Sequence, residues 1–123
     1  MTMKVLVADD DPEMLELVTN VARRHLHADV TQVSTGHELL DAIAHDAFDL
    51  VITDISMPWM TGLQVMHSVR AAGLPTPVVV MTGMQASELP EQVKALGDRA
   101  RLLHKPFTLQ ELLAAVGEIA HAA

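Results

Sequence analysis

Short apolar runs rich in β-branched residues alternate along the chain with longer stretches in which apolar residues recur at helical spacing. This alternation predicts repeated βα units around a parallel sheet, and the length accommodates five of them. The apolar runs predict strands at Lys4–Ala8, Asp29–Val33, Leu50–Thr53, Pro77–Met81 and Arg101–Leu103. The third and fourth runs are apolar enough to be central strands, because a central parallel strand is buried on both faces. The second and fifth runs are weaker.

The stretches of helical period follow these strands. Helices are expected from Asp11 to about Leu26, from Ser34 or Thr35 to about His45, from Gly62 to about Ala72, from about Ser87 to Leu96, and from Thr108 through Ile119. Asp11 precedes a proline and suits a helix N-cap, and Thr108 with Glu111 forms a capping box. Leu17 and Leu109 belong to the apolar stripes of the first and last helices. The fourth helix has few large apolar residues, so we expect it to be held most loosely.

Composition narrows the classes of function. The 123 residues, 50% of them apolar, suit one domain with a real core. A net charge of −8, from 8 basic and 16 acidic residues, repels the phosphate backbone and argues against direct nucleic-acid binding. The lack of cysteine excludes disulfides and thiolate metal sites. We expect a cytoplasmic location with no membrane contact, because the sequence has neither a signal-peptide pattern nor an apolar run of spanning length.

Polar residues stand directly after four of the five predicted strands. They are Asp9-Asp10-Asp11 after the first, Asp54 after the third, Thr82-Gly83 after the fourth and His104-Lys105 after the fifth. In a doubly wound parallel sheet the carboxyl ends of the strands face one crevice, so these residues are expected to meet there. Carboxylates from two strand ends supply the hard oxygen ligands that Mg²⁺ prefers. The pattern therefore predicts a magnesium site.

The same residues suit the handling of a phosphoryl group. An Asp54 carboxylate is a nucleophile that can form an acyl phosphate once its charge is offset. Lys105 offers a compact cation, Thr82 a hydroxyl donor, and Gly83 a backbone N–H that an anion can approach closely. Together these groups provide electrostatic stabilisation of a phosphoryl transfer.

Four ordered motifs resemble the receiver domains of bacterial two-component response regulators. They are Val5–Asp11, Asp54–Gly62, Val79–Gly83 and Lys105–Phe107, and they extend over essentially the whole chain. Pro58 and Gly62 lie four and eight residues after Asp54, as in that family. The resemblance implies an α/β fold that is flavodoxin-like and doubly wound, with a five-stranded parallel sheet of order 2-1-3-4-5 flanked by five helices. It also implies a single receiver domain over residues 1–123.

The resemblance further implies roles for these residues and for partners. The implied metal ligands for Mg²⁺ are Asp9, Asp10, Asp54 and the main-chain carbonyl of Ser56, and the implied phosphoryl contacts are Thr82, Gly83 and Lys105. Asp54 would be phosphorylated by a sensor histidine kinase or a phosphotransfer protein. The domain would catalyse only its own phosphorylation and dephosphorylation, so it is not expected to be an enzyme with a separate substrate. Its output would be altered binding of a downstream effector through helix four, strand five and helix five, or a homodimer formed on phosphorylation.

Two features depart from the family pattern. Receiver domains usually carry Tyr or Phe three residues before the lysine, where the ring turns inward when the threonine follows the phosphate. Leu102 stands there, and the chain has no tyrosine. We expect switching to run through Thr82, the backbone and Leu102, or to be muted. The Gly-Ala pair that usually precedes strand five is also absent, with Gly97 displaced, which leaves the geometry around helix four open.

Three alternatives remain at this point. A degenerate receiver would keep the fold and signal by protein contact alone, and Leu102 is its only support. A haloacid-dehalogenase-type phosphatase also uses an Asp nucleophile at a strand end, but it requires a second Asp where this chain has Ser56. A flavodoxin-like flavin carrier needs a phosphate-binding loop rich in Ser, Thr and Gly after strand one, where the acidic run Asp9–Asp11 would repel the phosphate.

Several polar and aromatic residues have simpler interpretations. Asp11 is better explained as a helix cap than as a metal ligand. The seven histidines are scattered without ligand spacing, which indicates surface positions. Trp59 is expected to be partly exposed near the site, and Met60 and Met84 could line a partner surface beside it.

Overall fold

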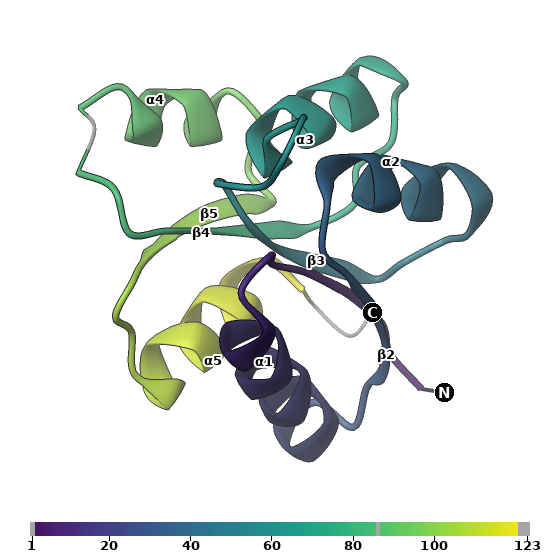
Figure 1. Cartoon of the computed structure of the whole chain (residues 1–123), viewed down its shortest axis with the longest axis vertical. Helices are drawn as coiled ribbons and strands as arrows, with labels where there is room; N and C mark the ends of the chain where they lie inside the picture. Colours follow the sequence, from purple (N-terminus) through teal and green to yellow (C-terminus); the bar gives the residue numbers. More distant parts are fainter. Residues whose placement is uncertain (1, 86, 121–123) are drawn as a thin grey trace.

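Five strands and five helices alternate in the computed structural model, which describes residues 2–85 and 87–120 (Figure 1). The strands are β1 (Lys4–Ala8), β2 (Asp29–Val33), β3 (Leu50–Asp54), β4 (Val78–Thr82) and β5 (Ala100–His104). The helices are α1 (Pro12–His25), α2 (Gly36–His45), α3 (Gly62–Ala71), α4 (Leu89–Lys94) and α5 (Leu109–Ile119). Within these described ranges no helix has both the length and the apolar character needed to cross a bilayer.

The strands form one parallel sheet of order β2-β1-β3-β4-β5, which confirms the predicted topology. All five residues of β3 and of β4 are buried, as the apolar runs predicted. The register pairs Ala8 with Thr53 and Asp54 with Met81, so β1, β3 and β4 end at nearly the same level. The residues that follow these strands therefore share one edge of the sheet.

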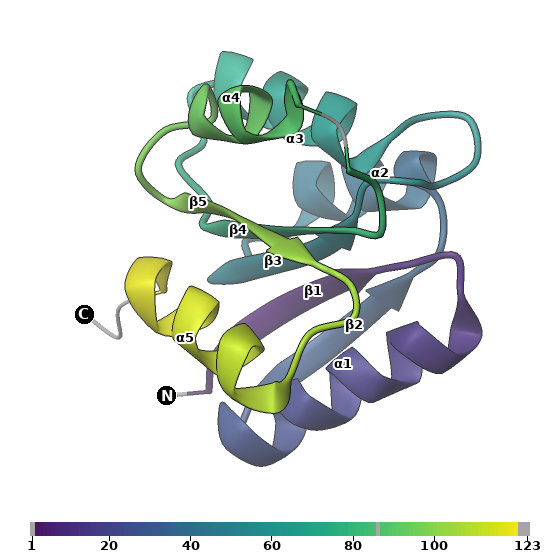
Figure 2. The ribbon, with the colours of Figure 1, turned by 90° about the vertical axis from the view of Figure 1, so that its left-hand side faces the viewer.

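The helices cover both faces of the sheet (Figure 2). Helices α2, α3 and α4 pack on one face, where Leu39, Met66 and Val93 join one apolar cluster. Helices α1 and α5 pack on the other face, where Val18 and Val116 join a second cluster. This doubly wound arrangement closes both faces, so the carboxyl edge of the sheet is the place where polar strand-end residues can gather.

Some predicted bounds were wrong. Helix α4 begins at Leu89 rather than Ser87, because Glu88 at its N-cap makes no side-chain capping bond and the buried residues Leu89 and Val93 fix the short helix. Strands β4 and β5 each run further toward the carboxyl edge than predicted, as far as Thr82 and His104. Strand β3 likewise includes Asp54, so this carboxylate belongs to a sheet residue.

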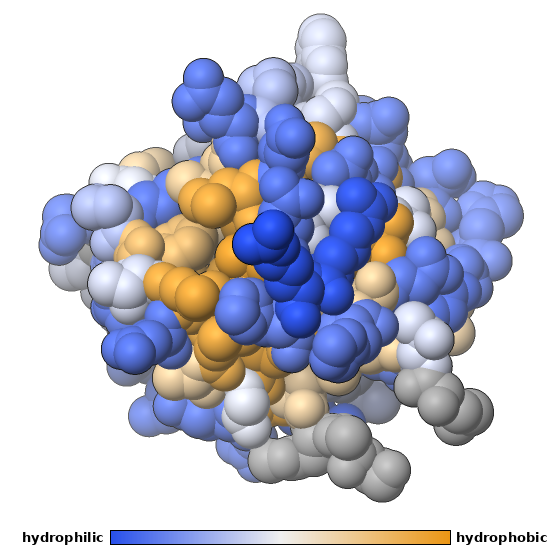
Figure 3. Space-filling model, turned by 90° about the horizontal axis from the view of Figure 1, so that it is seen from below, coloured by the Kyte–Doolittle hydropathy of each residue, from blue (hydrophilic) through white to orange (hydrophobic). Residues whose placement is uncertain are grey.

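The predicted width of the buried apolar stripe was too large for helices α1 and α5. Leu17 is 51% exposed and Leu109 is 42% exposed, so neither belongs to the core. Leu17 lies outside the side of α1 that buries Val18 and Ala22, and Leu109 is the first residue of α5. In Figure 3, which views this side of the molecule, apolar side chains reach the surface among charged ones.

Helix caps explain where three helices begin. Asp11 accepts a hydrogen bond from the Glu13 N–H, which confirms the predicted cap of α1. The capping box of Thr108 and Glu111 is also confirmed. A second capping box, formed by Thr61 and Gln64 at the start of α3, was not predicted, although the two residues have the required spacing. The six described histidines are exposed as predicted, and His121 lies outside the described residues.

Candidate functional site

Three carboxylates meet at the carboxyl edge of the sheet. Asp9 and Asp10 directly follow β1, and Asp54 ends β3. One oxygen from each lies within 4.8 Å of the others. Asp9 is completely buried and Asp54 is 7% exposed, whereas Asp10 is open to solvent. Residues separated by more than forty positions in sequence are thus brought together by the adjacency of β1 and β3.

The backbone around Asp54 is tightly fixed. The Ile55 N–H donates to the Met81 carbonyl at 2.9 Å, which continues the β3–β4 pairing past the strand end. The Gly62 N–H donates to the Ile55 carbonyl at 3.2 Å, which folds α3 back over the end of β3. A Cβ on Gly62 would lie 2.3 Å from the Asp54 carbonyl oxygen, so only glycine fits there. The Asp54 carboxylate is therefore held on a rigid strand end.

Lys105 bridges two of the carboxylates. Its Nζ lies 3.1 Å from Asp9 Oδ2 and 3.4 Å from Asp54 Oδ2. The Lys105 backbone N–H donates to the Thr82 carbonyl at 2.7 Å, which ties the residue to the end of β4. Three carboxylates and one ammonium leave this group with two net negative charges. The site is thus short of positive charge.

This charge balance perturbs the titration of both partners. Burial, followed by the charge of Asp9, raises the pKa of Asp54, and the opposing effect of Lys105 does not cancel this. For Lys105, burial lowers the pKa, but its hydrogen bond to Asp9 and the charges of Asp54 and Asp9 outweigh burial and raise it overall. Both shifts mean that this pocket favours additional positive charge, because a raised pKa favours the protonated form of Asp54 and the charged form of Lys105.

The donor set fits a hard divalent cation such as Mg²⁺. Carboxylate oxygens of Asp9, Asp10 and Asp54 are the ligands that such a cation prefers, and the net negative charge of the group favours it. Both oxygens of Asp9 already accept hydrogen bonds, Oδ1 from the Asp11 N–H and Oδ2 from Lys105. The oxygens of Asp10 and Asp54 are therefore the better placed for direct coordination.

The remaining predicted site residues surround this group. Thr82 is buried, and its Oγ accepts a hydrogen bond from the Met84 N–H at 2.9 Å. A Cβ on Gly83 would meet nothing within 4 Å, which leaves open space beside the backbone there. Ser56 is exposed, and its Oγ lies 3.8 Å from the Met84 sulfur. Sequence reasoning missed this contact between the loops after β3 and β4, because no local pattern encodes it.

Leu102 lies away from the carboxylates. It is partly buried and packs against the cluster beneath α2, α3 and α4, and its register partner in β4 is Val80. The residue paired with Thr82 is instead His104. The role of Leu102 in switching stays a prediction.

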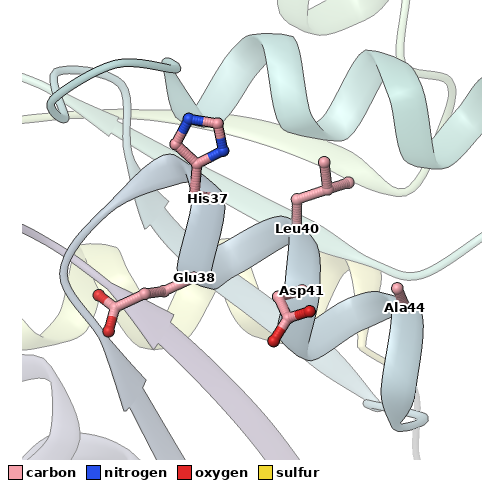
Figure 4. Close-up of a pocket in the computed structure, with 5 residues that line it drawn as sticks. All are labelled: His37, Glu38, Leu40, Asp41 and Ala44. Atoms are coloured by element: carbon pink, nitrogen blue, oxygen red, sulfur yellow. The ribbon is translucent and has the colours of Figure 1, made fainter.

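A separate hollow lies on α2 (Figure 4). It is lined by His37, Glu38, Leu40, Asp41 and Ala44, all from that one helix. None of the predicted site residues lines it. The hollow is therefore distinct from the acidic pocket and contributes nothing to it.

Fold and pocket together define a class, a flavodoxin-like α/β protein with a carboxylate cluster and a lysine at the carboxyl edge of its sheet. The family model of the response regulator receiver domain matches residues 5–117, and the chain belongs to this family. It is thus a signalling domain of the kind found in two-component response regulators. The acidic group of Asp9, Asp10 and Asp54 fits the Mg²⁺ site of such domains.

The chain is similar to curated response regulators and to solved receiver domains. It is 37% identical over 118 residues to the response regulator MprA of Mycolicibacterium vanbaalenii, covering 93% of this chain and 48% of that protein. It spans about half the length of such relatives. Among solved structures, the Francisella response regulator 1452 receiver domain has a TM-score of 0.85 at 28% identity, with 97% of each chain covered. The NarL signal receiver domain of Mycobacterium tuberculosis has a TM-score of 0.86 at 28% identity, covering 99% and 98%.

The raised pKa of Asp54 has a consequence for stability. An acid whose pKa is higher in the folded state stabilises the fold while protonated, and this contribution is lost as the pH rises through the folded pKa. Asp54→Asn removes the charge, so we expect it to raise the free energy of unfolding of the metal-free protein at neutral pH. The gain should disappear in acid, below the unfolded pKa of the carboxyl. Urea unfolding in EDTA across this pH range measures it.

Asp46→Asn is the matched control. A hydrogen bond from Lys4 lowers the pKa of Asp46, so its charge favours the folded state above the unfolded pKa. This substitution should give no gain in stability at neutral pH. If Asp54→Asn instead lost stability at neutral pH without metal, the carboxylate group would not carry the excess of negative charge inferred above.

Proposed function

We propose that the chain is a phosphorylation switch in which Asp54 accepts a phosphoryl group from a sensor histidine kinase or phosphotransfer protein in a Mg²⁺-dependent reaction. The observation that carries this proposal is the juxtaposition of a buried Asp54 with Asp9, Asp10 and Lys105. The haloacid-dehalogenase and flavodoxin alternatives lack such support, because Ser56 replaces the second Asp and acidic residues follow β1.

The chain's residues divide the chemistry among them. An Asp54 carboxylate oxygen attacks phosphorus, an O–P bond forms, and the P–N bond of a phosphohistidine breaks with its electron pair leaving to the imidazole. Lys105 lies 3.4 Å from Asp54 and would pair with a phosphoryl oxygen, while the Thr82 hydroxyl and Gly83 N–H would donate to the others. A bound divalent cation supplies the charge that offsets repulsion between the carboxylates and the incoming anion.

The bound phosphoryl would then act as the switch. It brings about −1.5 to −2 charge, which attracts Lys105 away from Asp9 and the Thr82 hydroxyl away from its bond with the Met84 N–H. Losing that bond would free the loop after β4 to move. A shift in the population of two arrangements would change partner binding through the face of α4, β5 and α5, with Leu102 on the β5 strand between these helices.

The remaining expectations belong to the same proposal. Residues 1–123 would act as a single receiver domain, in the cytoplasm and without membrane contact. Its partners would be the phosphodonor protein and a downstream effector protein or domain, with a homodimer formed on phosphorylation as a further state. The net charge of −8 argues against direct nucleic-acid binding by this chain.

A labelling assay with a small phosphodonor tests the proposal. The native protein, incubated with acetyl phosphate and Mg²⁺, should gain one phosphoryl group, detected by intact mass and removed by hydroxylamine as an acyl phosphate is. Asp54→Asn should gain none, and EDTA should abolish labelling of the native protein. Equal labelling of both proteins would show that Asp54 is not the phosphoacceptor. Partner binding without any metal-dependent labelling would instead select the degenerate receiver.

A further inference from the structure

The loop between β3 and α3, which begins directly after Asp54, presents Trp59 to solvent. The side chain is 89% exposed, and the residue has a φ of +72°, in the left-handed region that bulky residues rarely adopt. An exposed indole and a strained backbone are both unfavourable in the isolated domain. Trp59 therefore holds a position that the stability of this fold does not require.

The exposure of Trp59 is fixed by the loop around it. The Met60 N–H donates to the Pro58 carbonyl at 2.8 Å, which closes a tight turn about Trp59. A Cβ on Gly36 at the start of α2 would lie 2.0 Å from the Met60 carbonyl oxygen, so the helix presses directly on the loop. Because both contacts hold the backbone, the indole is presented outward rather than folded down onto the surface.

A second exposed apolar side chain lies in the loop that follows β4. Met84, in the loop after β4, is 48% exposed. Its sulfur lies 3.8 Å from the Ser56 hydroxyl, which joins the two loops immediately after Asp54. The two loops that flank the phosphoacceptor thus each carry an exposed, polarisable apolar side chain.

The burial of Asp54 determines how a phosphodonor can approach its carboxylate. Asp54 is 7% exposed, so phosphorus reaches its carboxylate only if the donor comes down onto the surrounding loops. A small phosphodonor can reach Asp54 without touching the exposed side chains of the loops after β3 and β4. A protein donor, by contrast, must place its own surface against these loops. A phosphorylated donor is anionic at that point and this chain has a net charge of −8, so the overall charges of the two proteins do not favour docking, and apolar contact on the loops supplies attraction beyond that of Lys105 and the cation.

From this geometry we infer that Trp59, together with Met84 in the neighbouring loop, is the anchor on which a protein phosphodonor docks, with the indole packed against apolar residues next to the phosphohistidine. The inference rests on the proposed function and names the surface through which the partner engages the site. Tryptophan is enriched among residues that dominate binding energy in interfaces, which suits a single large anchor.

Two donors with the same P–N bond separate docking from chemistry. The small donor is monophosphoimidazole, and the protein donor is a purified histidine kinase, autophosphorylated with ATP and chosen because it labels the native chain but not Asp54→Asn. For Trp59→Ala, the second-order rate constant of transfer from the kinase should fall about 30-fold, while that from monophosphoimidazole stays within about 2-fold. Trp59→Phe should retain most of the kinase rate.

Leu74→Ala is the matched control. Leu74 is 42% exposed but lies between α3 and the start of β4, at the opposite edge of the sheet, so both rates should be unchanged. Native rates of transfer from the kinase in Trp59→Ala would overturn the inference, as would an equal loss with both donors, which would place Trp59 in the pocket itself. Failure of monophosphoimidazole to label the native chain would instead overturn the proposed function and the inference with it.

Discussion

Lys105→Ala is expected to slow phosphorylation of Asp54 by a small phosphodonor about 100-fold, since one preorganised charged donor contributes an effect of that order. In the metal-free protein it should also lower the free energy of unfolding by about 3 kcal/mol at neutral pH, because a buried charge is left without its partner. Lys105 Nζ lies 3.1 Å from the fully buried Asp9 and 3.4 Å from Asp54. Labelling kinetics and urea unfolding in EDTA measure the two effects.

The loss of stability should depend on pH at both ends of the range. The raised pKa of Lys105 means that its contribution is complete below the unfolded pKa of lysine and is lost as the pH rises through the folded pKa. In acid, protonation of Asp54, whose pKa is raised, removes a charge that Lys105 compensates, so the deficit should shrink there as well. The difference between variant and native protein is thus expected to be largest around neutral pH.

Lys4→Ala provides a comparison for the same chemical change. Lys4 also pairs with a carboxylate, that of Asp46, but both side chains are substantially exposed. Solvent screens an exposed pair of this kind, so the substitution should alter stability little and labelling not at all. If Lys105→Ala behaved like Lys4→Ala in both measurements, the ammonium would have no part in the pocket.

The positions of the site residues could be predicted because they depend on topology rather than on distance in sequence. Once the alternation of apolar runs indicates a parallel sheet, a residue directly after a strand is assigned to one edge. This places Asp9, Asp54 and Lys105 together without knowledge of any side-chain contact, and the distances among them agree. The prediction held because β1 and β3 are neighbours in the sheet.

Other features could not be predicted because they depend on contacts between loops and helix ends. Examples are the contact between Ser56 and Met84 and the close contact between Gly36 of α2 and Met60. Both form only when the connections after β2, β3 and β4 fold over the carboxyl edge of the sheet. No pattern in the sequence around Gly36, the first residue of α2, predicts its contact with Met60. The lack of a side chain at Gly36 makes room for the backbone of the loop beside Asp54.

Periodicity overestimated the buried surface of two helices for a related reason. It gives the direction of an apolar stripe but not its width, which the neighbouring elements determine. Leu17 and Leu109 continue the stripes of α1 and α5 yet lie beyond the area that the sheet covers. The exposure of Trp59 was underestimated in the same way, since a sequence does not show that a loop turns its side chain outward.

Gly62→Ala is expected to damage both the fold and the site, although it adds a single methyl group. The new Cβ would lie 2.3 Å from the Asp54 carbonyl oxygen and 2.6 Å from the Thr53 hydroxyl, distances that force atoms to move. Because the nearest obstacle is backbone, α3 and the end of β3 must separate, at a cost of about 1–3 kcal/mol for an overpacked contact. The displaced strand end carries the Asp54 carboxylate away from Lys105, so labelling by a small phosphodonor should fall about 100-fold.

The same methyl group placed on Gly117 isolates the steric cause. A Cβ there meets nothing within 4 Å, and the residue lies within α5, so Gly117→Ala should raise the free energy of unfolding by about 0.5–1 kcal/mol. It should leave labelling unchanged, because Gly117 is exposed and its new Cβ would contact nothing. The two variants are thus expected to move stability in opposite directions. Native stability together with native labelling in Gly62→Ala would show that the start of α3 does not hold Asp54 in place.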